Sequence, residues 1–438
     1  MSGAETGSAP EPELAPSSVP IPDGAAVSSG PRPADSPALS RARAESPGTW
    51  DAVVLSSFGG PEGQDDVIPF LRNVTRGRGI PDERLEDVAG HYRAHGGVSP
   101  INGQNRALRA ALEAELRERG IDTPVTWANR NWEPYVGDVL RRLHEEGRDR
   151  ILVLATSAFA GYSSCRQYRE DWGVALAESG LREQMTVGKI RQYFDLPGLL
   201  TPFAEGLCEA LERVAGQGPV RVLFAAHSVP DADALASGPE TMRASFTGGS
   251  AYADQLLAAS REIMDRTRAQ LRAVGSDLPP ETDWELVFQS RSGAPGTPWL
   301  EPDVSDAIER AADERAAAVI VVPVGFVSDH MEVVWDLDTE ARETAERRGL
   351  AFVRTPTPGT HPAFVRGLAD LIEQRMADRT APPRVSACGD GTWFDACPAD
   401  CCRKILRGST EPRPTIAQLP AGQPVPVGVD DDGDVVRA

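Results

Sequence analysis

The chain has 438 residues, which is more than a single hydrophobic core usually supports, so two domains are expected. Apolar residues make up 40% of the chain and charged residues 25%, a composition that excludes a wholly disordered protein. The net charge of −20 comes from 45 basic and 65 acidic residues, and this excess of acid disfavours nucleic-acid binding. Because no apolar run reaches about 18 residues, we expect no membrane span and no stable membrane association.

Both ends of the chain have compositions typical of disorder. Residues 1–48 contain nine prolines and nine serines without hydrophobic periodicity, and we expect a disordered leader there. They lack the basic start and the apolar segment of a secretory signal, so a cytoplasmic location is expected. Residues 406–438, which are rich in proline and glycine, are predicted to be a disordered tail.

Between these ends, short apolar runs alternate with amphipathic helical patterns. Such alternation predicts an α/β fold in which helices cover both faces of parallel sheets. The apolar runs that favour buried strands are residues 51–58, 151–155, 220–226, 284–289 and 318–324.

Two strand-and-turn segments resemble each other: VVLSSFGGPEG at residues 53–63 and VLFAAHSVPDA at residues 222–232. They indicate an internal duplication, with two similar doubly wound, Rossmann-like domains. Ligands of such folds bind in a crevice at the carboxyl ends of the strands, so we expect the active-site cleft between the two domains. The predicted segments are a first domain at 49–200, a second domain at 218–356, a helix at 360–380 that packs back on the first domain, and a cysteine-rich segment at 385–405.

His227 directly follows the predicted strand at residues 220–226. A histidine at the carboxyl end of a buried strand faces the crevice, where its neutral imidazole can bind a metal or accept a proton. The alternative is a hydrogen-bonded histidine at a strand edge, and its position in the sequence leaves both interpretations open.

A polar cluster follows the predicted strand at residues 318–324, with Asp329 and His330 close to Glu332. Glu332, Asp336 and Glu340 recur at intervals of four residues, so they share one face of a helix. Carboxylate oxygens suit hydrated Fe²⁺ or Mg²⁺, and these residues therefore predict a path for a divalent cation. A solvated acidic helix face is the alternative.

Arginines near the first strand combine with glycine-rich turns and Ser99. Arg72, Arg76 and Arg78 precede the segment HYRAHGGVSPIN, which contains Ser99. Guanidinium groups and hydroxyls bind carboxylates, although surface arginines are usually only solvated.

The sequence has six cysteines, and four of them, Cys388, Cys397, Cys401 and Cys402, lie within fifteen residues. Clustered cysteines in a cytoplasmic protein favour metal binding over disulfides, with free thiols as the alternative. Three ligands are expected from this segment, because adjacent cysteines seldom bind one metal atom together. The fourth must be remote, and we prefer Cys165; Cys208 is more typical of a helix core residue.

Six motifs occur in an order that resembles the ferrochelatases, and more narrowly the actinobacterial coproporphyrin ferrochelatases with a C-terminal [2Fe–2S] cluster. The resemblance covers residues 50–405 and implies a lyase that inserts Fe²⁺ into a porphyrin between two similar domains. The motifs are VLSSFGGPEG, GGVSPIN, NRNWEP, AAHSVP, FQSRSG-x-P-x-x-PWLEPDV and VPVGFVSDHMEVVWDLD.

The resemblance implies roles for individual residues. His227 and Glu332 would be the catalytic residues and metal ligands, on opposite walls of the cleft and bracketing the porphyrin. Asp336 and Glu340 match an outer metal path. Ser99 and Tyr168 match porphyrin contacts, with Arg76 a weaker candidate, and Phe58 stands where several relatives have a tyrosine near the iron. The [2Fe–2S] ligands would be Cys165, Cys388, Cys397 and either Cys402 or Cys401.

The expected substrates are coproporphyrin III and Fe²⁺. Membrane-bound relatives that use protoporphyrin have a longer apolar lip, whereas residues 60–79 here are charged, with a short apolar run at 67–71. The expected product is coproheme, with release of two protons, on the route to heme b and to a downstream coproheme decarboxylase. The alternatives are a protoporphyrin IX ferrochelatase, a cobalt chelatase, and a non-catalytic porphyrin or iron carrier with an Fe–S sensor.

Overall fold

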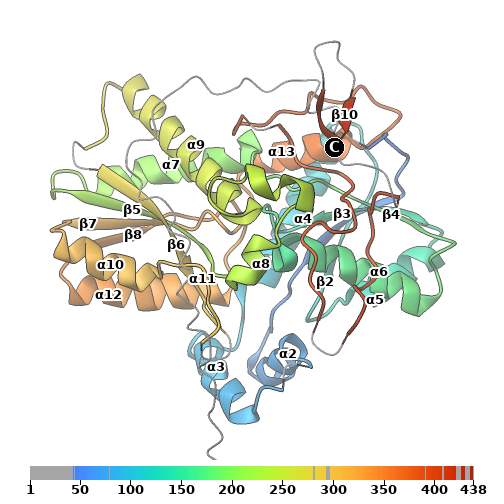
Figure 1. The fold of residues 1–438 in the computed structure, drawn as a ribbon, viewed down its shortest axis with the longest axis horizontal. Helices are drawn as coiled ribbons and strands as arrows, with labels where there is room; N and C mark the ends of the chain where they lie inside the picture. The colour runs from blue at the N-terminus through green and yellow to red at the C-terminus, as the bar shows by residue number, and fades with distance from the viewer. Residues whose placement is uncertain are drawn as a thin grey trace, which may run out of the picture.

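The computed structural model describes residues 43, 45–77, 79–279, 282–292, 296–389, 391–406, 409–420, 426–429 and 435–437. Most of the predicted disordered leader and part of the predicted tail therefore lie outside the described residues. Figure 1 shows two α/β halves side by side. Within the described residues, no helix combines the length and apolar character needed to cross a membrane.

The first half is built on a parallel sheet of order β2-β1-β3-β4. In β1 (Ala52–Ser57), Val53 and Leu55 enter one hydrophobic core, while Ala52 and Val54 enter another. Because side chains alternate across a strand, both faces of the sheet are buried beneath helices. The other elements are β2 (Val125–Asn129), β3 (Arg150–Ala155), β4 (Thr186–Lys189), α4 (Pro100–Glu118), α5 (Val136–Glu145), η2 (Tyr162–Arg166) and α6 (Gln167–Ser179).

The second half repeats this design, with the parallel order β6-β5-β7-β8. In β5 (Val220–His227), Val222 and Phe224 enter the core shared with the first half, while Leu223 and Ala225 face a separate core. The other elements are β6 (Thr282–Gln289), β7 (Ala318–Val322), β8 (Ala351–Arg354), α8 (Asp231–Leu235), η3 (Glu240–Ser245), α9 (Ala251–Ala273), α10 (Val304–Asp313), α11 (Met331–Trp335), η4 (Asp336–Ala341) and α12 (Arg342–Arg347).

The predicted fold class is confirmed: both sheets are parallel, doubly wound and of matching strand order. The five predicted strands correspond to β1, β3, β5, β6 and β7. The sequence analysis missed β2, β4 and β8, which occupy edges of the sheets. The segments VTWAN, TVGK and AFVR have only four or five residues, and each contains exposed or half-buried positions, so no continuous apolar run marks them.

Two further helices join the halves. Helix α7 (Pro197–Arg213) connects them, and α13 (Pro362–Glu373), inside the segment 360–380, packs against α7 and against α4 of the first half. Arg119 at the end of α4 pairs with Asp370 of α13 at 2.6 Å. The C-terminal helix thus lies on the first half after the chain has completed the second.

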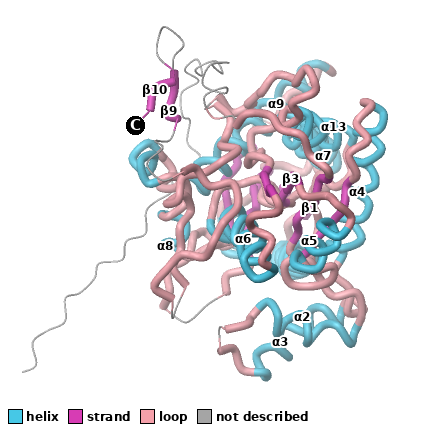
Figure 2. The backbone as a smooth tube through the Cα atoms, turned by 90° about the vertical axis from the view of Figure 1, so that its right-hand side faces the viewer, coloured by secondary structure: helices cyan, strands magenta, loops and turns pink. Residues whose placement is uncertain are grey.

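A small helical unit stands apart from the two sheets in both views (Figures 1 and 2). It consists of η1 (Gln64–Asp66), α2 (Val67–Val74) and α3 (Asp82–Ala94), and it has its own hydrophobic cluster around Phe70. This unit, which we call the lip, contains the segment identified as charged rather than apolar.

The predicted disordered tail at 406–438 is wrong for residues 409–420. Ile416 is buried against Trp172 and its neighbours, and the Arg169 guanidinium donates to the Ile416 carbonyl at 3.0 Å. Cys397 N–H donates to the Ala417 carbonyl at 3.0 Å. One buried isoleucine and a buried guanidinium hold this segment, which its proline-rich composition does not reveal. Beyond it, β9 (Pro426–Val429) and β10 (Val435–Arg437) form an antiparallel pair.

Candidate active site and cysteine site

His227 is the last residue of β5, and Glu332 lies in the first turn of α11, after β7. Strands β5 and β7 are neighbours, so their carboxyl ends bring these residues together. His227 Nε2 lies 3.5 Å from Glu332 Oε2. His227 Nδ1 contacts the Ser228 carbonyl, and the Tyr252 hydroxyl donates to the His227 carbonyl at 2.9 Å. The ring is therefore held with Nε2 toward the carboxylate.

The two side chains form an ion pair. Burial disfavours the charged ring, but the Glu332 carboxylate and the Ser228 carbonyl raise the pKa of His227 to about 9. Partial desolvation opposes the Glu332 charge, although the side chain is 47% exposed, but His227 and then His330 lower the pKa of Glu332 to about 2. His330 Nδ1 lies 3.7 Å from Glu332 on its other side, and burial keeps the pKa of His330 below its ordinary value. Glu332 is thus a carboxylate between an imidazolium and a neutral imidazole.

The expectation that His227 and Glu332 lie on opposite walls, bracketing the porphyrin, is wrong for this structure. Both residues belong to the second half, and their side chains are in direct contact. The physical reason is the strand order, which puts β5 beside β7. A porphyrin would therefore contact His227 and Glu332 on the same side of its ring, and it cannot lie between the two side chains while they remain paired.

The acidic residues behind Glu332 follow an irregular helix. After α11 the chain forms a π-helical turn, η4, which contains Asp336 and Glu340. Such turns widen the helix and are frequent at functional sites. Burial, followed by the charges of Glu332 and Glu340, raises the pKa of Asp336 to about 7 despite a hydrogen bond from Ser290. Glu340 is exposed and accepts a hydrogen bond from Trp335 Nε1 at 2.8 Å. The three acids predicted to share a face thus lie close enough to influence one another.

The first half contacts this acidic segment. Asp329 N–H donates to Gln104 Oε1 of α4 at 2.8 Å. His91 of the lip stacks on Trp335 of α11, with ring centroids 4.0 Å apart and planes 7° from parallel. Tyr92, next to His91, is half-buried, and desolvation together with the charges of Glu332 and Asp336 raises its pKa. The carboxylates therefore lie between the second-half sheet and the lip.

The predicted porphyrin contacts do not lie in direct contact with this pair. Ser99 is buried at the start of α4, and its N–H donates to the Pro61 carbonyl at 2.9 Å. Tyr168 is 7% exposed beneath Arg130, whose guanidinium carbon is 4.3 Å from the ring centroid. Arg76 is exposed on the lip, where its guanidinium donates to Asn73 at 2.5 Å.

Arg130 is a residue that the sequence analysis did not select, although the quoted motif NRNWEP contains it. It follows β2, pairs with Asp171 at 2.6 Å and lies 6.0 Å from the centroid of the Phe58 ring. Its Nη2 is buried without a hydrogen-bond partner in the described part of the chain. Phe58, at the end of β1, packs edge-on against Phe70 of the lip. This wall therefore presents a cation and aromatic rings instead of a metal ligand.

Four cysteines are buried together: Cys165, Cys397, Cys401 and Cys402. Cys165, in η2, contacts Cys397, which also contacts Cys401, and the Cys401 and Cys402 sulfurs are 3.8 Å apart. Cys388 is half-buried against the same hydrophobic core. Cys208 lies elsewhere, on α7, where its thiol contacts Gln270 Oε1 at 3.3 Å.

Both halves hold the segment that carries these cysteines. Arg166, next to Cys165, donates to the Ala399 carbonyl at 2.7 Å and the Cys401 carbonyl at 3.0 Å. From the second half, Gly238 N–H donates to Cys402 Sγ at 3.2 Å. The C-terminal segment thus fills the junction between η2 and the loop that follows the His227 strand.

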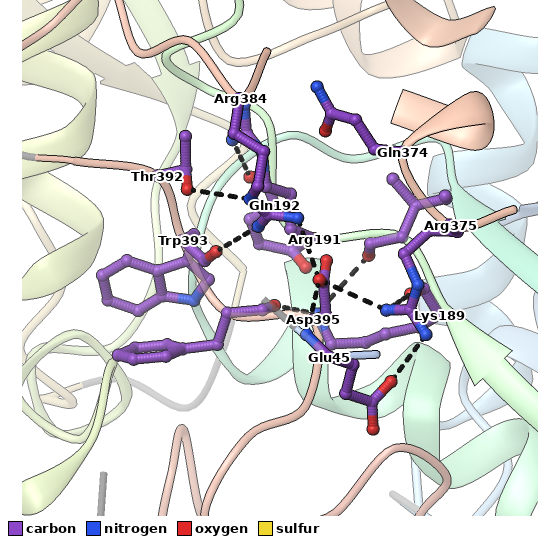
Figure 3. A network of polar contacts seen from close by, with 12 residues as sticks. Glu45, Lys189, Arg191, Gln192, Gln374, Arg375, Arg384, Thr392, Trp393 and Asp395 are labelled. Carbon is purple, nitrogen blue, oxygen red and sulfur yellow. Dashed lines mark hydrogen bonds and ion pairs between the residues drawn. The ribbon is translucent and has the colours of Figure 1, made fainter. Parts of the chain in front are cut away.

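Buried cations surround these thiols. Hydrogen bonds from Cys165 and Cys401, together with the charges of Lys189 and Arg169, lower the pKa of Cys397 well below its ordinary value. Lys189 also donates to the Phe394 carbonyl at 2.8 Å. Figure 3 shows that Lys189 belongs to a wider buried network centred on Asp395. The site therefore favours negative charge on Cys397 and Cys402, whereas hydrogen bonds to these two sulfurs, followed by burial, raise the pKa of Cys165 and of Cys401.

Two doubly wound halves, with a histidine and a carboxylate in contact near the strand ends of one of them and two further acids in the helical turn behind, form the kind of site that a metal chelatase, which is a lyase, requires. The ferrochelatase family model matches residues 50–376. The chain therefore belongs to the ferrochelatase family, and the expected family is confirmed.

Several relatives match over nearly their whole length. The chain is 51% identical over 383 residues to the coproporphyrin III ferrochelatase of Leifsonia xyli, covering 85% of this chain and 95% of that one. It is 47% identical over 375 residues to the coproporphyrin III ferrochelatase of Streptomyces coelicolor, covering 84% and 96%. Among solved structures, SirB from Bacillus subtilis with Fe³⁺ has a TM-score of 0.41 at 10% identity, covering 75% of this chain and 97% of that one.

Proposed function

We propose that this protein is a coproporphyrin ferrochelatase, which inserts Fe²⁺ into coproporphyrin III and releases two protons to give coproheme on the route to heme b. The observation that carries the proposal is the His227–Glu332 pair with Asp336 and Glu340 behind it. The names of the relatives at 47% and 51% identity support coproporphyrin III as the substrate.

The acidic residues suit the delivery of a hydrated divalent cation. Glu340 and Glu332 are exposed and Asp336 between them is half-buried, so the oxygens of all three carboxylates are available to replace water ligands of the cation in turn. Fe²⁺ that reaches Glu332 competes with the His227 imidazolium for the carboxylate. Metal binding to Glu332 is therefore linked to loss of the His227 proton.

His227 is the proposed proton acceptor. A free-base porphyrin loses two N–H protons as iron enters, so a base must be held over the macrocycle. Nδ1 of His227 is occupied by its contact with the Ser228 carbonyl. Once the imidazolium has lost a proton, Nε2 is therefore the nitrogen that can accept a proton from the porphyrin. The exposed third of the His227 side chain is the part that a macrocycle can contact.

Two features of the first half support a tetracarboxylate substrate. The unpartnered Nη2 of Arg130 is a donor that fits a carboxylate, so Arg130 joins Ser99, Tyr168 and Arg76 as a proposed propionate contact. The lip buries most of its apolar residues in its own core, which leaves little apolar surface for a membrane-bound porphyrin.

The test is an anaerobic insertion assay followed by absorbance and mass spectrometry. Wild-type protein is incubated with Fe²⁺ and either coproporphyrin III or protoporphyrin IX, and then with Co²⁺ in place of Fe²⁺. We expect coproheme as the main product, formed at least tenfold faster than protoheme. Preference for protoporphyrin IX or for Co²⁺, or binding of porphyrin without any insertion, would contradict the proposal.

We also propose that the cysteine segment binds a [2Fe–2S] cluster. Such a cluster takes four thiolates, two on each iron. No set of three or more His, Cys, Asp or Glu side chains among the described residues surrounds a single metal position. Pairs of sulfurs suffice for a two-iron cluster, however, and two thiolates on one tetrahedral iron lie about 3.8 Å apart, given bonds of about 2.3 Å. The 3.8 Å between the Cys401 and Cys402 sulfurs fits this spacing and is compatible with a set in which both cysteines bind.

The proposed ligands are Cys165, Cys397 and Cys402 or Cys401, with Cys388 as the fourth. The contacts among Cys165, Cys397, Cys401 and Cys402 offer an alternative in which both adjacent cysteines bind and Cys388 does not. Buried Lys189 and Arg169 suit the negative charge of either set. When bound, the cluster supplies a cross-link between the C-terminal segment and η2; it has no electron-transfer role, because iron insertion leaves Fe²⁺ in its oxidation state.

Single cysteine variants test these ligands by visible absorbance and iron content. Cys165→Ala and Cys397→Ala should abolish the cluster, whereas Cys208→Ala, the matched control, should retain two irons per chain. Loss of the cluster in Cys208→Ala but not in Cys165→Ala would overturn the remote ligand. Retention in Cys388→Ala would select the set that contains both Cys401 and Cys402.

We propose a cytoplasmic location, where thiols remain reduced until a cluster is assembled. Its product still carries four propionates. A decarboxylase that acts on coproheme is therefore the proposed downstream partner, and direct transfer between the two proteins can be tested by co-purification.

A further inference from the structure

The motif FQSRSG contains two polar residues that the proposed reaction has not yet used. Gln289, the last residue of β6, pairs in register with His227, and Ser228 N–H donates to the Gln289 carbonyl at 2.8 Å. The chain leaves the sheet immediately afterwards, at Ser290. These two residues therefore lie directly beside the His227–Glu332 pair.

Both side chains bind the acidic segment. The buried Gln289 donates through Nε2 to the Glu332 carbonyl at 2.9 Å and to Asp336 Oδ2 at 3.4 Å. Ser290 Oγ donates to the same Asp336 oxygen. One residue thus anchors the main chain at Glu332, while both anchor the carboxylate of Asp336.

The backbone at Ser290 indicates that the hydroxyl is the feature required there. Its φ of +61° lies in the left-handed region, which residues other than glycine seldom adopt. Glycine would adopt this conformation without strain. Serine differs from glycine only by its hydroxymethyl side chain. The contribution of this side chain to the turn is therefore the hydrogen bond to Asp336.

The acidic segment needs such an anchor. The charges of Glu332 and Glu340 both oppose ionisation of Asp336, which lies in the π-helical turn η4. Without donors from β6, mutual repulsion would favour rotation of the Asp336 carboxylate away from Glu332. Two donors at the end of a rigid strand oppose that rotation.

We propose that Ser290 and Gln289 are positioning residues for iron delivery, which hold Asp336 and Glu332 in line so that Fe²⁺ passes from one carboxylate to the next. This inference rests on the proposed function. It assigns these residues no contact with the porphyrin, so their effect should fall on the metal.

The first test is anaerobic calorimetric titration of the protein with Fe²⁺ alone, using Ser290→Ala and Ser290→Gly. We expect both variants to bind Fe²⁺ about tenfold more weakly, because both lose the donor to a charged group. Ser290→Asn tolerates a positive φ and restores a donor, so it should recover most of the affinity. Wild-type affinity in Ser290→Gly would overturn the proposal, since a merely structural role would be satisfied by glycine.

The second test separates the two substrates kinetically. The KM for Fe²⁺ should rise about tenfold in Ser290→Ala and in Gln289→Met, while the KM for coproporphyrin III stays within twofold. Arg315→Gly is the matched control, because Arg315 has a φ of +66° at a turn remote from the site, and it should leave both constants unchanged. Equal changes in both KM values would overturn the proposal.

The two proposals can fail separately. A wild-type protein that binds Fe²⁺ in a Ser290-dependent manner but inserts none would overturn the proposed function and support the positioning role. A protein that inserts iron, but whose affinity for Fe²⁺ does not depend on Ser290 or Gln289, would support the proposed function and overturn the positioning role.

Discussion

Asp395→Asn is expected to destabilise the protein strongly, because this carboxylate is the centre of a buried network of charges (Figure 3). Asp395 Oδ2 accepts from Arg384 Nη1 at 2.9 Å and from Glu45 N–H at 3.0 Å, and Arg375 Nη1 lies at 3.4 Å. The Asp395 and Arg375 side chains are each 2% exposed. Burial opposes the charge, but Arg384, Arg375 and Lys189 lower the pKa of Asp395.

The magnitude follows from the charges that would be left behind. Asparagine keeps the size and one acceptor but removes the negative charge, so the buried guanidinium of Arg375 loses one of its two acidic partners, and Arg384 loses the carboxylate that it pairs with at 2.9 Å. Removing one partner of a buried ion pair costs about 3–5 kcal/mol. Arg375 retains Glu45 at 2.6 Å, which places the expected loss near the lower end, at about 3 kcal/mol.

The assay is urea unfolding followed by circular dichroism, together with the rate at which a thiol reagent labels the cluster-free protein. We expect a lower unfolding midpoint and faster labelling of the buried cysteines, because Asp395 holds the segment that carries them. Asp277→Asn is the control: its pair with Arg272 is 72% and 81% exposed and should contribute less than about 0.5 kcal/mol. A loss below about 1 kcal/mol in Asp395→Asn, or one equal to the control, would refute the reasoning.

Two further predictions concern the active site. His227→Ala should fold and bind coproporphyrin III but lose nearly all iron insertion; activity within tenfold of the wild type would contradict its role as the base. Glu332→Gln should lower the pKa of His227, because it removes the carboxylate that raises this pKa to about 9. In the wild type, the raised pKa makes the pair stabilising below about pH 6.5, and this contribution is lost as the pH rises through about 9. Unfolding measured from pH 6 to 10, with NMR titration of the His227 ring, should show this loss in the wild type and a smaller one in Glu332→Gln.

Much of the architecture could be predicted from sequence because buried parallel strands are apolar on both faces. Segments such as AVIVV in β7 have this property, whereas the edge strands β2, β4 and β8 do not. His227 and Glu332 were selected because each follows such a strand. Their direct contact was not predictable, because it depends on β5 and β7 being neighbours in the sheet, and no local sequence pattern indicates the order of the strands.

Other features of the two sites could not be predicted for a related reason: they depend on contacts between residues that are distant in the sequence. Cys165 and Cys397 were both selected as cysteine ligands, but their direct contact was not predictable, because the two residues are far apart in the chain and only the return of the C-terminal segment to the first half makes them neighbours. Gln289 and Ser290 look like an ordinary polar turn, since a positive φ at a serine has no sequence signature. Arg130 is one of many arginines, and its unpartnered Nη2 appears only after Asp171 and Tyr168 have been placed around it.

The matching strand orders of the two halves have a consequence for how one chain can build an asymmetric site. If two identical copies of such a half associated as a symmetric dimer, every acid at one strand end would face its own duplicate, and a substitution on one wall would appear on the other. In a single chain, the equivalent positions are free to differ. The end of β5 carries His227 where the end of β1 is followed by Phe58, and by the strand registers Gln289 of β6 stands where Arg130 follows β2. One half thereby presents carboxylates to a cation, while the other presents a guanidinium and aromatic rings to a flat anion.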